Sequence, residues 1–423
     1  MIPGPTSLPL ISHTVPFLRD PYGTYFRLRD RYDGAFRLPV LGQTWIVLPG
    51  PEAIEAVMTG AHFSTKLGLR AFAPLFSGGL LHLDEDHRAH RRILQVAFRS
   101  EAMRGYLARL QDQIGPILDT WPPDRTAFEP LARDLTLRQA AHVFMGLTDD
   151  AAIARFNRLF QTEIAGTTAL IRRPLPLTRM GRAVAARRTL ADDFRALIAP
   201  RRAEGGSDLF SRLCVARDEA GATLTDDEIV DHFNFFLAAA HDATTTALTV
   251  ITWALARDPT LQDRLRAEVD ALPDGPLSWE DLPRLDLLDR IHKEALRRFA
   301  PSAFTARRVL EGFDWQGHHI PAGRDVVIAL GPVMMDPDLW PDPARFDPDR
   351  HLAPPPNRYA WAPYGGGAHK CIGIHFAVMQ LKVIVTALLR RRRIALDPAD
   401  DPAWRLLPTP GPKNGLPLKL PLR

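Results

Sequence analysis

Cysteine is scarce in this chain, since only Cys214 and Cys371 occur among its 423 residues. Two cysteines cannot make a disulfide scaffold or a four-cysteine zinc or iron–sulfur site, and so few are typical of a protein from a reducing cytoplasm. Residues 1–21 are rich in proline and hold no run of about 18 apolar residues. We therefore expect a cytoplasmic protein with neither a signal peptide nor a membrane anchor.

An excess of charge and a flexible linker are also missing. The net charge of +4 is small for this length and does not indicate a nucleic-acid partner. No long glycine- and serine-rich stretch divides the chain, and helical patterns resume on both sides of its softest break, residues 201–208. With 46% hydrophobic and 24% charged residues the composition is that of a globular protein. We expect one large helix-rich domain over residues 1–423.

Helical periodicity dominates the pattern of apolar residues. Between Asp84 and about Arg201 it is broken near Pro122 and near Pro174, while Phe63–Leu83 has no firm period and is expected to be a flexible loop. Alternating residues predict a β-hairpin and further short strands, which lie at Gly34–Leu48, Ala303–Leu310, Phe313–Ile320 and Asp325–Leu330. The predicted fold class is mainly α with small β-sheets (α+β).

The longest apolar segment, Ile229–Ala256, contains neither proline nor glycine and predicts a buried helix. Its centre is unusual, because small side chains are followed there by an acid and by alcohols, in the stretch Leu237–Ala247, LAAAHDATTTA. Such a centre is unexpected in the middle of a buried apolar helix and needs an explanation.

The decapeptide Tyr364–Gly373, YGGGAHKCIG, carries the chemistry. Three adjacent glycines let the backbone approach something flat and bulky. Cys371 then opens a helix, where oriented N–H groups favour the thiolate, and Gly373 lets that helix pack closely. One thiolate in such a setting suits a cysteine-ligated haem iron. A nucleophilic cysteine with His369 or His375 is the alternative, a zinc site lacks enough ligands, and Cys214 is interpreted as a small buried hydrophobe.

The order aromatic-Gly-x-Gly-x-His-x-Cys-x-Gly resembles the haem-binding signature of the cytochrome P450 family, of the soluble bacterial type. The resemblance implies the mainly helical P450 fold and haem b (iron protoporphyrin IX) as cofactor. It makes Cys371 the metal ligand, His369 a haem-propionate contact and Gly373 part of the haem site. Phe is more usual in the family at Tyr364.

Further residues match the family in order along the chain. Glu294 and Arg297 lie three apart on one predicted helix face and match its Glu-x-x-Arg pair. Arg350 matches the second arginine of a structural ion network, although Phe is more usual at His351. The resemblance also implies three more propionate contacts, for which an arginine fork is suited. These contacts are His87, Arg91 and Arg307, where Arg308 remains an alternative to Arg307.

In that fold the long helix crosses the oxygen-binding face of the haem, which gives the alanines at its centre a reason. The family pattern Ala-Gly-x-Asp/Glu-Thr-Thr aligns with Ala239–Thr244, so Asp242 can supply protons. Ala243 stands where the family has the threonine that helps to split O–O, and Thr244 lies about 100° away round a regular helix. A bulged helix could turn Thr244 inward, a substrate hydroxyl or ordered water could replace the alcohol, or the enzyme could be a poor monooxygenase. We favour the second.

The resemblance implies a pocket that is apolar, as a lipophilic ligand requires. The predicted lining is Phe72, Leu75, Phe76, Phe236, Ala240, Ala303, Phe304 and Leu407, while Phe233 and Phe235 are interpreted as core. No dinucleotide fingerprint occurs, so electrons must come from a separate ferredoxin and ferredoxin reductase. Arg88, Arg92, Arg99 and Arg390–Arg393 could form the docking patch, or the last run could be a solvated helix end.

The predicted function is a haem-thiolate monooxygenase that inserts one atom of O2 into a lipophilic small molecule of terpenoid, steroid or fatty-acid type. Two alternatives stay open. One is a haem-binding sensor or carrier on the same scaffold. The other is a peroxide-dependent or isomerising haem-thiolate enzyme, which the alanine at position 243 would suit.

Overall fold

The long apolar segment folds as one helix, α12 (Asp226–Arg257), which is α-helical at every residue. A capping box starts it, because the Thr225 hydroxyl accepts from the backbone N–H of Glu228 and the Glu228 carboxylate accepts from the backbone N–H of Thr225. Acidic residues fill its first turn and Arg257 its last, which complements the helix dipole. The predicted helix is confirmed, and it contains no bulge that would turn Thr244.

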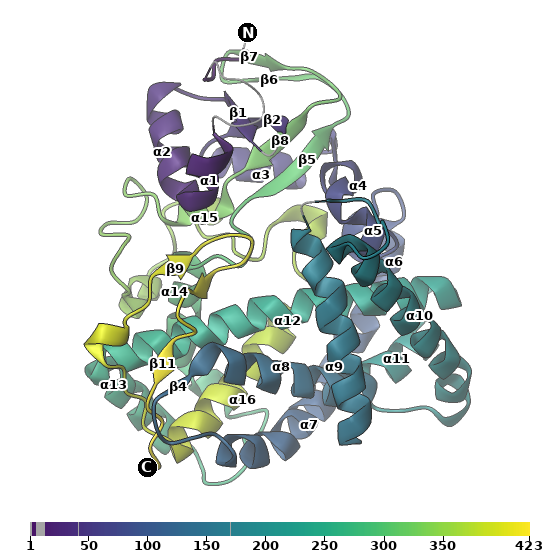
Figure 1. Cartoon of the computed structure of the whole chain (residues 1–423), viewed down its shortest axis with the longest axis vertical. Helices are drawn as coiled ribbons and strands as arrows, with labels where there is room; N and C mark the ends of the chain where they lie inside the picture. Colours follow the sequence, from purple (N-terminus) through teal and green to yellow (C-terminus); the bar gives the residue numbers. More distant parts are fainter. Residues whose placement is uncertain (1, 6–12, 41, 170) are drawn as a thin grey trace. The chain divides into compact units, whose positions relative to one another are not determined.

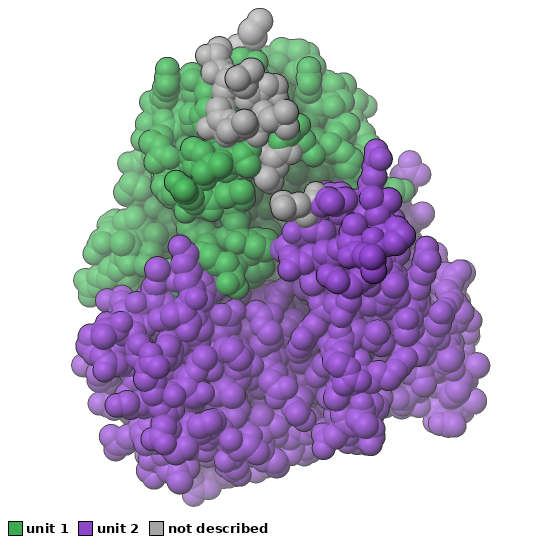
Figure 2. All heavy atoms as spheres, viewed as in Figure 1, with its two compact units in different colours: residues 1–70, 290–371, 404–410 green, residues 71–289, 372–403, 411–423 purple. Residues whose placement is uncertain are grey.

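The computed structural model describes residues 2–5, 13–40, 42–169 and 171–423. The chain forms two compact units, each assembled from three stretches (Figure 2). Unit 1 comprises residues 1–70, 290–371 and 404–410, and unit 2 comprises residues 71–289, 372–403 and 411–423. Because the chain enters each unit more than once, neither is a separate stretch of sequence, and one domain over residues 1–423 remains a prediction.

Unit 1 contains short helices and most of the strands (Figure 1). Its helices are α1 (Thr14–Arg19), α2 (Pro21–Arg31), α3 (Pro51–Thr59), α4 (Thr65–Gly68), α15 (Leu330–Met334) and most of α14 (Asp286–Arg298). Its strands are β1 (Phe36–Val40), β2 (Gln43–Leu48), β3 (Phe63–Ser64), β5 (Thr305–Val309), β6 (Phe313–Trp315), β7 (His318–Ile320), β8 (Asp325–Ile328) and β9 (Trp404–Arg405). All the predicted strands are confirmed.

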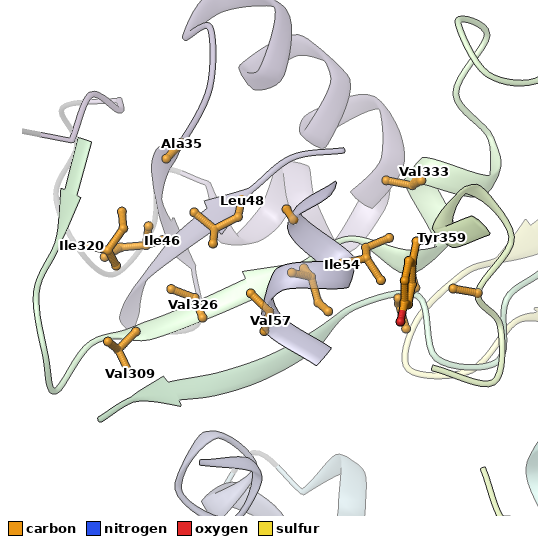
Figure 3. Packing of buried hydrophobic residues seen from close by; sticks show 14 of the residues in the cluster. Ala35, Ile46, Leu48, Ile54, Val57, Val309, Ile320, Val326, Val333 and Tyr359 are labelled. Carbon is orange, nitrogen blue, oxygen red and sulfur yellow. The ribbon is translucent and has the colours of Figure 1, made fainter. Parts of the chain in front are cut away.

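Five of these strands form one sheet in the order β1-β2-β8-β5-β3. The strands β1 and β2 are the predicted hairpin, with Val40 opposite Gln43, whereas β2 and β8 run parallel. Since side chains alternate along a strand, Ile46 and Leu48 share one face of β2 and pack against α3 through Ile54 (Figure 3). Phe17 of α1 and residues of α2 pack with the other face. The sheet is thus buried on both sides.

Unit 2 is helical (Figure 1). Besides α12 it contains α5 (Ala73–Phe76), α6 (His87–Gln95), α7 (Ser100–Asp119), α8 (Phe128–Met145), α9 (Asp150–Ala165), α10 (Arg179–Glu204), α11 (Leu209–Val215), α13 (Pro259–Asp270) and α16 (Ile374–Arg391). Its strands are β4 (Thr126–Ala127), which pairs with β11 (Pro417–Leu418), and β10 (Gly411–Pro412). The stretch Gly367–Arg391, which includes α16, is long and apolar enough to cross a membrane, but it is 67% buried over the window that passes this test.

Short 3-10 turns join many elements: η1 (Arg70–Phe72), η2 (Leu80–His82), η3 (Val96–Phe98), η4 (Gly166–Thr168), η5 (Leu282–Arg284), η6 (Pro348–Leu352), η7 (Arg358–Ala360), η8 (Gly367–His369) and η9 (Pro398–Asp400). The expectation of a flexible loop over Phe63–Leu83 is wrong in its local structure. That segment holds β3, α4, η1, α5 and η2, which are too short to produce a visible helical period.

A buried ion network fixes the end of α14 in unit 1. Glu294 and Arg297 are both fully buried, and the guanidinium reaches the carboxylate with Nε at 2.8 Å and Nη2 at 2.9 Å. Arg350 Nε donates to the same carboxylate at 3.1 Å and His351 Nε2 lies 3.0 Å from it. Arg297 also donates to the carbonyl of Met334. The predicted ion network of Glu294, Arg297 and Arg350 is thus present, and His351 is a fourth member.

The pKa of Glu294 is lowered to about 2. Burial alone would raise this pKa, but hydrogen bonds from Arg297 and His351 and the positive charge of Arg297 outweigh it. The folded chain therefore binds fewer protons here than the unfolded chain between the ordinary pKa of 4.5 and about 2. The stabilisation is present above pH 4.5 and is lost as the pH falls through this window.

We expect Glu294→Gln to lower the free energy of unfolding by roughly 3–5 kcal/mol, because it leaves the buried Arg297 uncompensated. Urea denaturation at neutral pH measures this loss. Glu55→Gln, at an exposed position on α3, is the matched control and should change the free energy by less than about 0.5 kcal/mol. The difference in the free energy of unfolding between wild type and Glu294→Gln should become smaller below pH 4.5. A gap that stays constant down to pH 2 contradicts the role of this carboxylate.

Candidate functional site

The glycines before Cys371 are required by the backbone itself. Gly365 and Gly367 have φ of 68° and 60°, a region that favours glycine. A Cβ on Gly367 would lie 1.9 Å from the carbonyl oxygen of Met58 on α3, and one on Gly366 would lie 2.7 Å from the ring of Tyr359. The loop can therefore lie against α3 only because its glycines have no side chains.

Cys371 follows this loop directly. Its backbone N–H donates to the carbonyl of Tyr364 at 3.0 Å, and its side chain is exposed. Helix α16 begins three residues later at Ile374, with Gly373 as its N-cap. A Cβ on Gly373 would have no atom within 4 Å. The expectation that Gly373 serves close packing of the helix is therefore wrong, and open space of this kind suits a bulky group beside the thiol.

Tyr364 has a hydrogen-bonding partner that the sequence did not indicate. Its hydroxyl lies 3.3 Å from Nε2 of His292 on α14, and its ring centroid lies 6.0 Å from that of Trp361. The extra hydroxyl, relative to the more usual Phe, thus ties the start of the cysteine loop to α14. His292 gave no signal in the sequence because no pattern connects it to the loop.

Arg307 and Arg308 differ in their surroundings on β5. Arg308 Nε donates to Asp325 at 2.5 Å. Arg307 is buried and donates to the Thr305 hydroxyl at 3.0 Å and to the Ala306 carbonyl at 2.9 Å. Arg308 is thus paired with a carboxylate, and the choice of Arg307 as the propionate contact stays a prediction. His369 ends η8 in the same unit and is half-buried.

In unit 2 the centre of α12 leaves one face uncovered. Ala239 is exposed and Ala240 and Ala243 are half-buried, although Phe236 and Thr244 beside them are buried. Positions 239 and 240 lie four and three residues before position 243, so the three side chains lie toward one face of a regular helix. The middle of this helix thus carries methyl groups that the described residues cover only in part.

Asp242 is held from the neighbouring helix α8. Arg133 Nη1 donates to Asp242 Oδ1 at 2.7 Å, and Arg133 Nη2 donates to Glu129 at 3.1 Å. The Asp242 side chain is about one-third exposed, at 31%. Sequence reasoning missed Arg133, because its pairing depends on how α8 packs against α12. Burial lowers the pKa of the adjacent His241 to about 4, so that imidazole is neutral at pH 7.

The threonines after Asp242 serve the helix and its packing. Thr245 donates to the carbonyl of His241 at 3.0 Å, and its hydroxyl lies 2.8 Å from that of Thr136 on α8. Thr249 and Thr252 likewise donate to carbonyls four residues earlier. Because α12 is regular, Thr244 keeps its position about 100° away from Ala243.

His87 and Arg91 lie one turn apart on α6. His87 is buried, and burial together with the nearby Arg91 lowers its pKa to about 4. His87 is therefore a neutral imidazole at pH 7, able to donate one hydrogen bond, while Arg91 carries the positive charge.

The predicted pocket residues of unit 2 come together in part. Phe72, Leu75 and Phe76 share one apolar cluster with Phe235, which the sequence analysis had interpreted as core. We call this the roof cluster; its members are Phe72, Leu75, Phe76, Ile164, Ala169, Met180, Ala183, Val184, Phe235 and Ala238. Phe236 contacts Phe98 at a centroid distance of 5.8 Å and Phe235 at 6.4 Å. Phe233 packs against Phe194 and Phe210, as expected of core.

The predicted pocket residues of unit 1 pack against other apolar residues of the same unit. Phe304 packs on Phe17 with ring centroids 5.2 Å apart, and Leu407 lies against the same core cluster. Ala303 is buried as well. Packing alone therefore accounts for their apolar character within this unit.

One residue of the predicted docking patch is not on the surface. Arg392, part of the predicted cationic run, is buried and donates to the carbonyls of Leu420, Leu118 and Trp121. It therefore cannot dock a partner.

A pocket of about 380 Å³ lies between α7, α16 and residues 275–277 of unit 2. Its lining includes none of the predicted substrate-pocket residues.

Comparison with known proteins gives a consistent result. Residues 152–411 match the family model described as Cytochrome P450. A Mycobacterium tuberculosis protein whose name assigns it to the cytochromes P450 as number 136 is 33% identical over 99% of this chain and 88% of its own. The cyclooctat-9-en-7-ol 5-monooxygenase of Streptomyces melanosporofaciens is 30% identical over 96% of this chain and 90% of its own.

A solved structure also matches over the full length. It is described as retinoic acid bound cyanobacterial CYP120A1, and it is 28% identical with a TM-score of 0.89, covering 100% of this chain and 99% of that chain. The mainly helical fold class with small sheets is thereby confirmed.

The two glycines that flank Cys371 should respond differently to the same change. Gly367→Ala forces a Cβ against the Met58 carbonyl at a positive φ, so we expect a loss of roughly 2–4 kcal/mol in the free energy of unfolding. Gly373→Ala meets no protein atom and should change the stability of the haem-free chain by less than about 0.5 kcal/mol. Thermal unfolding of both haem-free variants measures this. Equal losses of stability in the two variants would contradict the finding that a Cβ clashes at Gly367 and has free space at Gly373.

Proposed function

Because the chain belongs to the cytochrome P450 family, whose members are haem-dependent monooxygenases, we propose that it oxidises a lipophilic terpenoid with electrons from a separate ferredoxin. The observation that carries the proposal is the glycine loop that leads to an exposed Cys371, with open space at Gly373. Haem bound there supplies an iron centre that activates O2, with the thiolate ligand favouring O–O cleavage.

The residues of the chain fit haem in their chemistry. Cys371 would provide the thiolate, and Ala239, Ala240 and Ala243 would leave room for haem and substrate because their own side chains are small. The predicted propionate contacts are His87, Arg91, Arg307 and His369. Arg307 is buried, and its guanidinium is held by the Thr305 hydroxyl and the Ala306 carbonyl, which supports its part in this set.

A terpenoid substrate is supported by two lines of evidence. The roof cluster is apolar throughout, as a pocket for a lipophilic molecule requires. The names of two similar proteins mention cyclooctat-9-en-7-ol and retinoic acid, each a hydrocarbon body with one polar group. We extend that class of substrate to this chain.

Proton supply is the step in which this chain departs from the family. We propose Asp242 as the acid that hands protons inward, with Arg133 as the residue that positions it. Ala243 has no hydroxyl, and the regular helix keeps Thr244 on another face. A substrate hydroxyl or an ordered water therefore takes the place of the family's threonine, and a single hydroxyl on the substrate would suit this role.

An acidic ferredoxin is the redox partner that surface charge favours. Arg88, Arg92 and Arg99 are exposed on unit 2, and cationic patches steer acidic partners. We also propose that the protein works in the cytoplasm, which its low cysteine content and its bacterial relatives support.

The function is tested with purified holoenzyme, ferredoxin, ferredoxin reductase and NAD(P)H, with retinoic acid and a cyclic terpene alcohol as probes. We expect a ferrous–CO spectrum of thiolate-ligated haem and an oxygenated product. A haem sensor or carrier would give the spectrum without product. The ratio of product to NAD(P)H, measured in wild type and in Ala243→Thr, tests the missing alcohol. A low ratio in wild type that Ala243→Thr raises would favour a poor monooxygenase, whereas a high ratio that the change does not improve excludes it.

Arg133→Met should lower the ratio of product to NAD(P)H, because Asp242 loses the cation that holds its carboxylate. We expect a fall on the order of twofold to tenfold, the size of a change of about 0.5–1.4 kcal/mol in one step. Arg138→Met, on the same helix and paired with the exposed Asp134, is the matched control. If both variants keep the wild-type ratio, Arg133 does not position the acid.

A further inference from the structure

A buried acid joins two helices beside the roof cluster. Glu163 on α9 and Asn234 on α12 are both fully buried. The amide Nδ2 of Asn234 donates to Glu163 Oε1 at 2.7 Å. A glutamate with no access to water is costly when ionised, unless cations or several donors surround it.

The donors around this acid are too few for a carboxylate. Glu163 Oε2 and Asn234 Oδ1 are buried and have no hydrogen-bond partner among the described residues. The nearest cation is Arg187 on α10, whose Nε lies 3.9 Å from Glu163 Oε1, beyond hydrogen-bonding distance. Arg187 instead donates to Asp231 and to the carbonyl of Leu75. An ionised Glu163 would thus leave two buried acceptors without a hydrogen bond, which is unfavourable.

A proton on the Glu163 carboxyl group would give both of these oxygens, Glu163 Oε2 and Asn234 Oδ1, a hydrogen bond. A protonated carboxyl group has an O–H donor, and the neighbouring amide oxygen is an acceptor that lacks a donor. With Asn234 Nδ2 already bound to Oε1, an O–H on Oε2 that donates to Asn234 Oδ1 closes a ring of two hydrogen bonds between acid and amide. No further donor or ion is needed.

We propose that Glu163 is a positioning residue that works as a neutral acid, and that its proton pairs it with Asn234 and so holds α9 against α12 under the roof cluster. The neighbours of the pair in sequence, Ile164 and Phe235, belong to that cluster. Loss of the proton would therefore loosen the apolar surface that we assign to the substrate. This role rests on the proposed function, because it concerns the pocket of that enzyme.

The groups that face Glu163 agree with this protonation state. Arg187 on α10 would favour the ionised form, but it is shared with Asp231 on α12, and burial raises the pKa of Asp231 too. His241 on α12 lies against Phe160, which is about one turn before Glu163 on α9. For Glu163 itself, burial outweighs Asn234 and Arg187 and raises the pKa to about 7.

The sign of the pH effect follows. The folded chain holds a proton on Glu163 between the ordinary pKa of 4.5 and about 7, where the unfolded chain has released it. The pair is thus complete in acid, and its contribution to stability is lost as the pH rises through about 7. This is the reverse of the behaviour of Glu294.

Infrared difference spectroscopy of the holoenzyme tests the proton directly. At pH about 6 we expect the C=O band of a protonated, hydrogen-bonded carboxyl group, which shifts in D2O and fades as the pH is raised through about 7. Glu163→Gln should lack the band, since its amide can make the same two hydrogen bonds without a carboxyl. Glu101→Gln, exposed on α7, is the matched control and should keep it. In Asn234→Leu the band should move to the frequency of a carboxyl without a partner.

The effect on the pocket is measured by CO rebinding to the ferrous holoenzyme after flash photolysis, because CO is uncharged at every pH. In wild type and Glu101→Gln we expect the rate of CO rebinding to change with a midpoint near pH 7. In Glu163→Gln the rate should stay, at every pH, at the value that wild type has at acidic pH. Absence of the infrared band at pH about 6, or a pH profile that Glu163→Gln leaves unchanged, overturns the inference. A missing thiolate–haem CO spectrum would instead overturn the proposed function and leave the infrared result standing.

Discussion

The carboxylate of Glu294 is the interaction on which the chemistry-bearing part of unit 1 depends. It is fully buried and still ionised, because Arg297, Arg350, His351 and the backbone N–H of Asp347 all donate to it. These donors come from α14 and from the proline-rich segment that runs toward the cysteine loop, a segment with little regular hydrogen bonding of its own. One buried charge thus does for this segment what a ladder of backbone bonds does for a sheet, and the position of the loop before Cys371 follows from it.

The sequence predicted the features that depend on local chemistry and missed those that depend on packing between elements. Gly367 could be singled out because only glycine fits its backbone, and the helix around Ala240 because its apolar run is long. Arg133 could not, since an arginine on a helix face looks solvated until the neighbouring helix brings Asp242 to it. Phe304 shows why apolar character alone does not separate the two cases, because an apolar residue suits a pocket and a core equally. It packs on Phe17, and its place in the substrate pocket stays a prediction.

The alanines and threonines of α12 illustrate how one helix serves two demands. Its threonines donate back to carbonyls four residues earlier and contact α8, which keeps polar side chains satisfied inside a buried interface. Its alanines at positions 239, 240 and 243 stand on a different face, where they are exposed or half-buried. An alanine at position 243, where the family has a threonine, therefore leaves the helix intact. This separation explains why a chain can lose that hydroxyl without losing its fold.

Glu163 and Glu294 show that burial alone does not determine the state of a carboxyl group. Both have no exposed surface. Glu294 is surrounded by donors and cations, so its pKa falls to about 2, whereas Glu163 has one amide donor and a distant arginine, so its pKa rises to about 7. The first is a fixed charge at every pH at which the protein is folded, suited to an anchor. The second lies close to the point of gaining or losing its proton, which suits a contact that can loosen. An acid with one donor therefore has a different physical task from one surrounded by several donors and cations, and the number of donors around each decides which task it can perform.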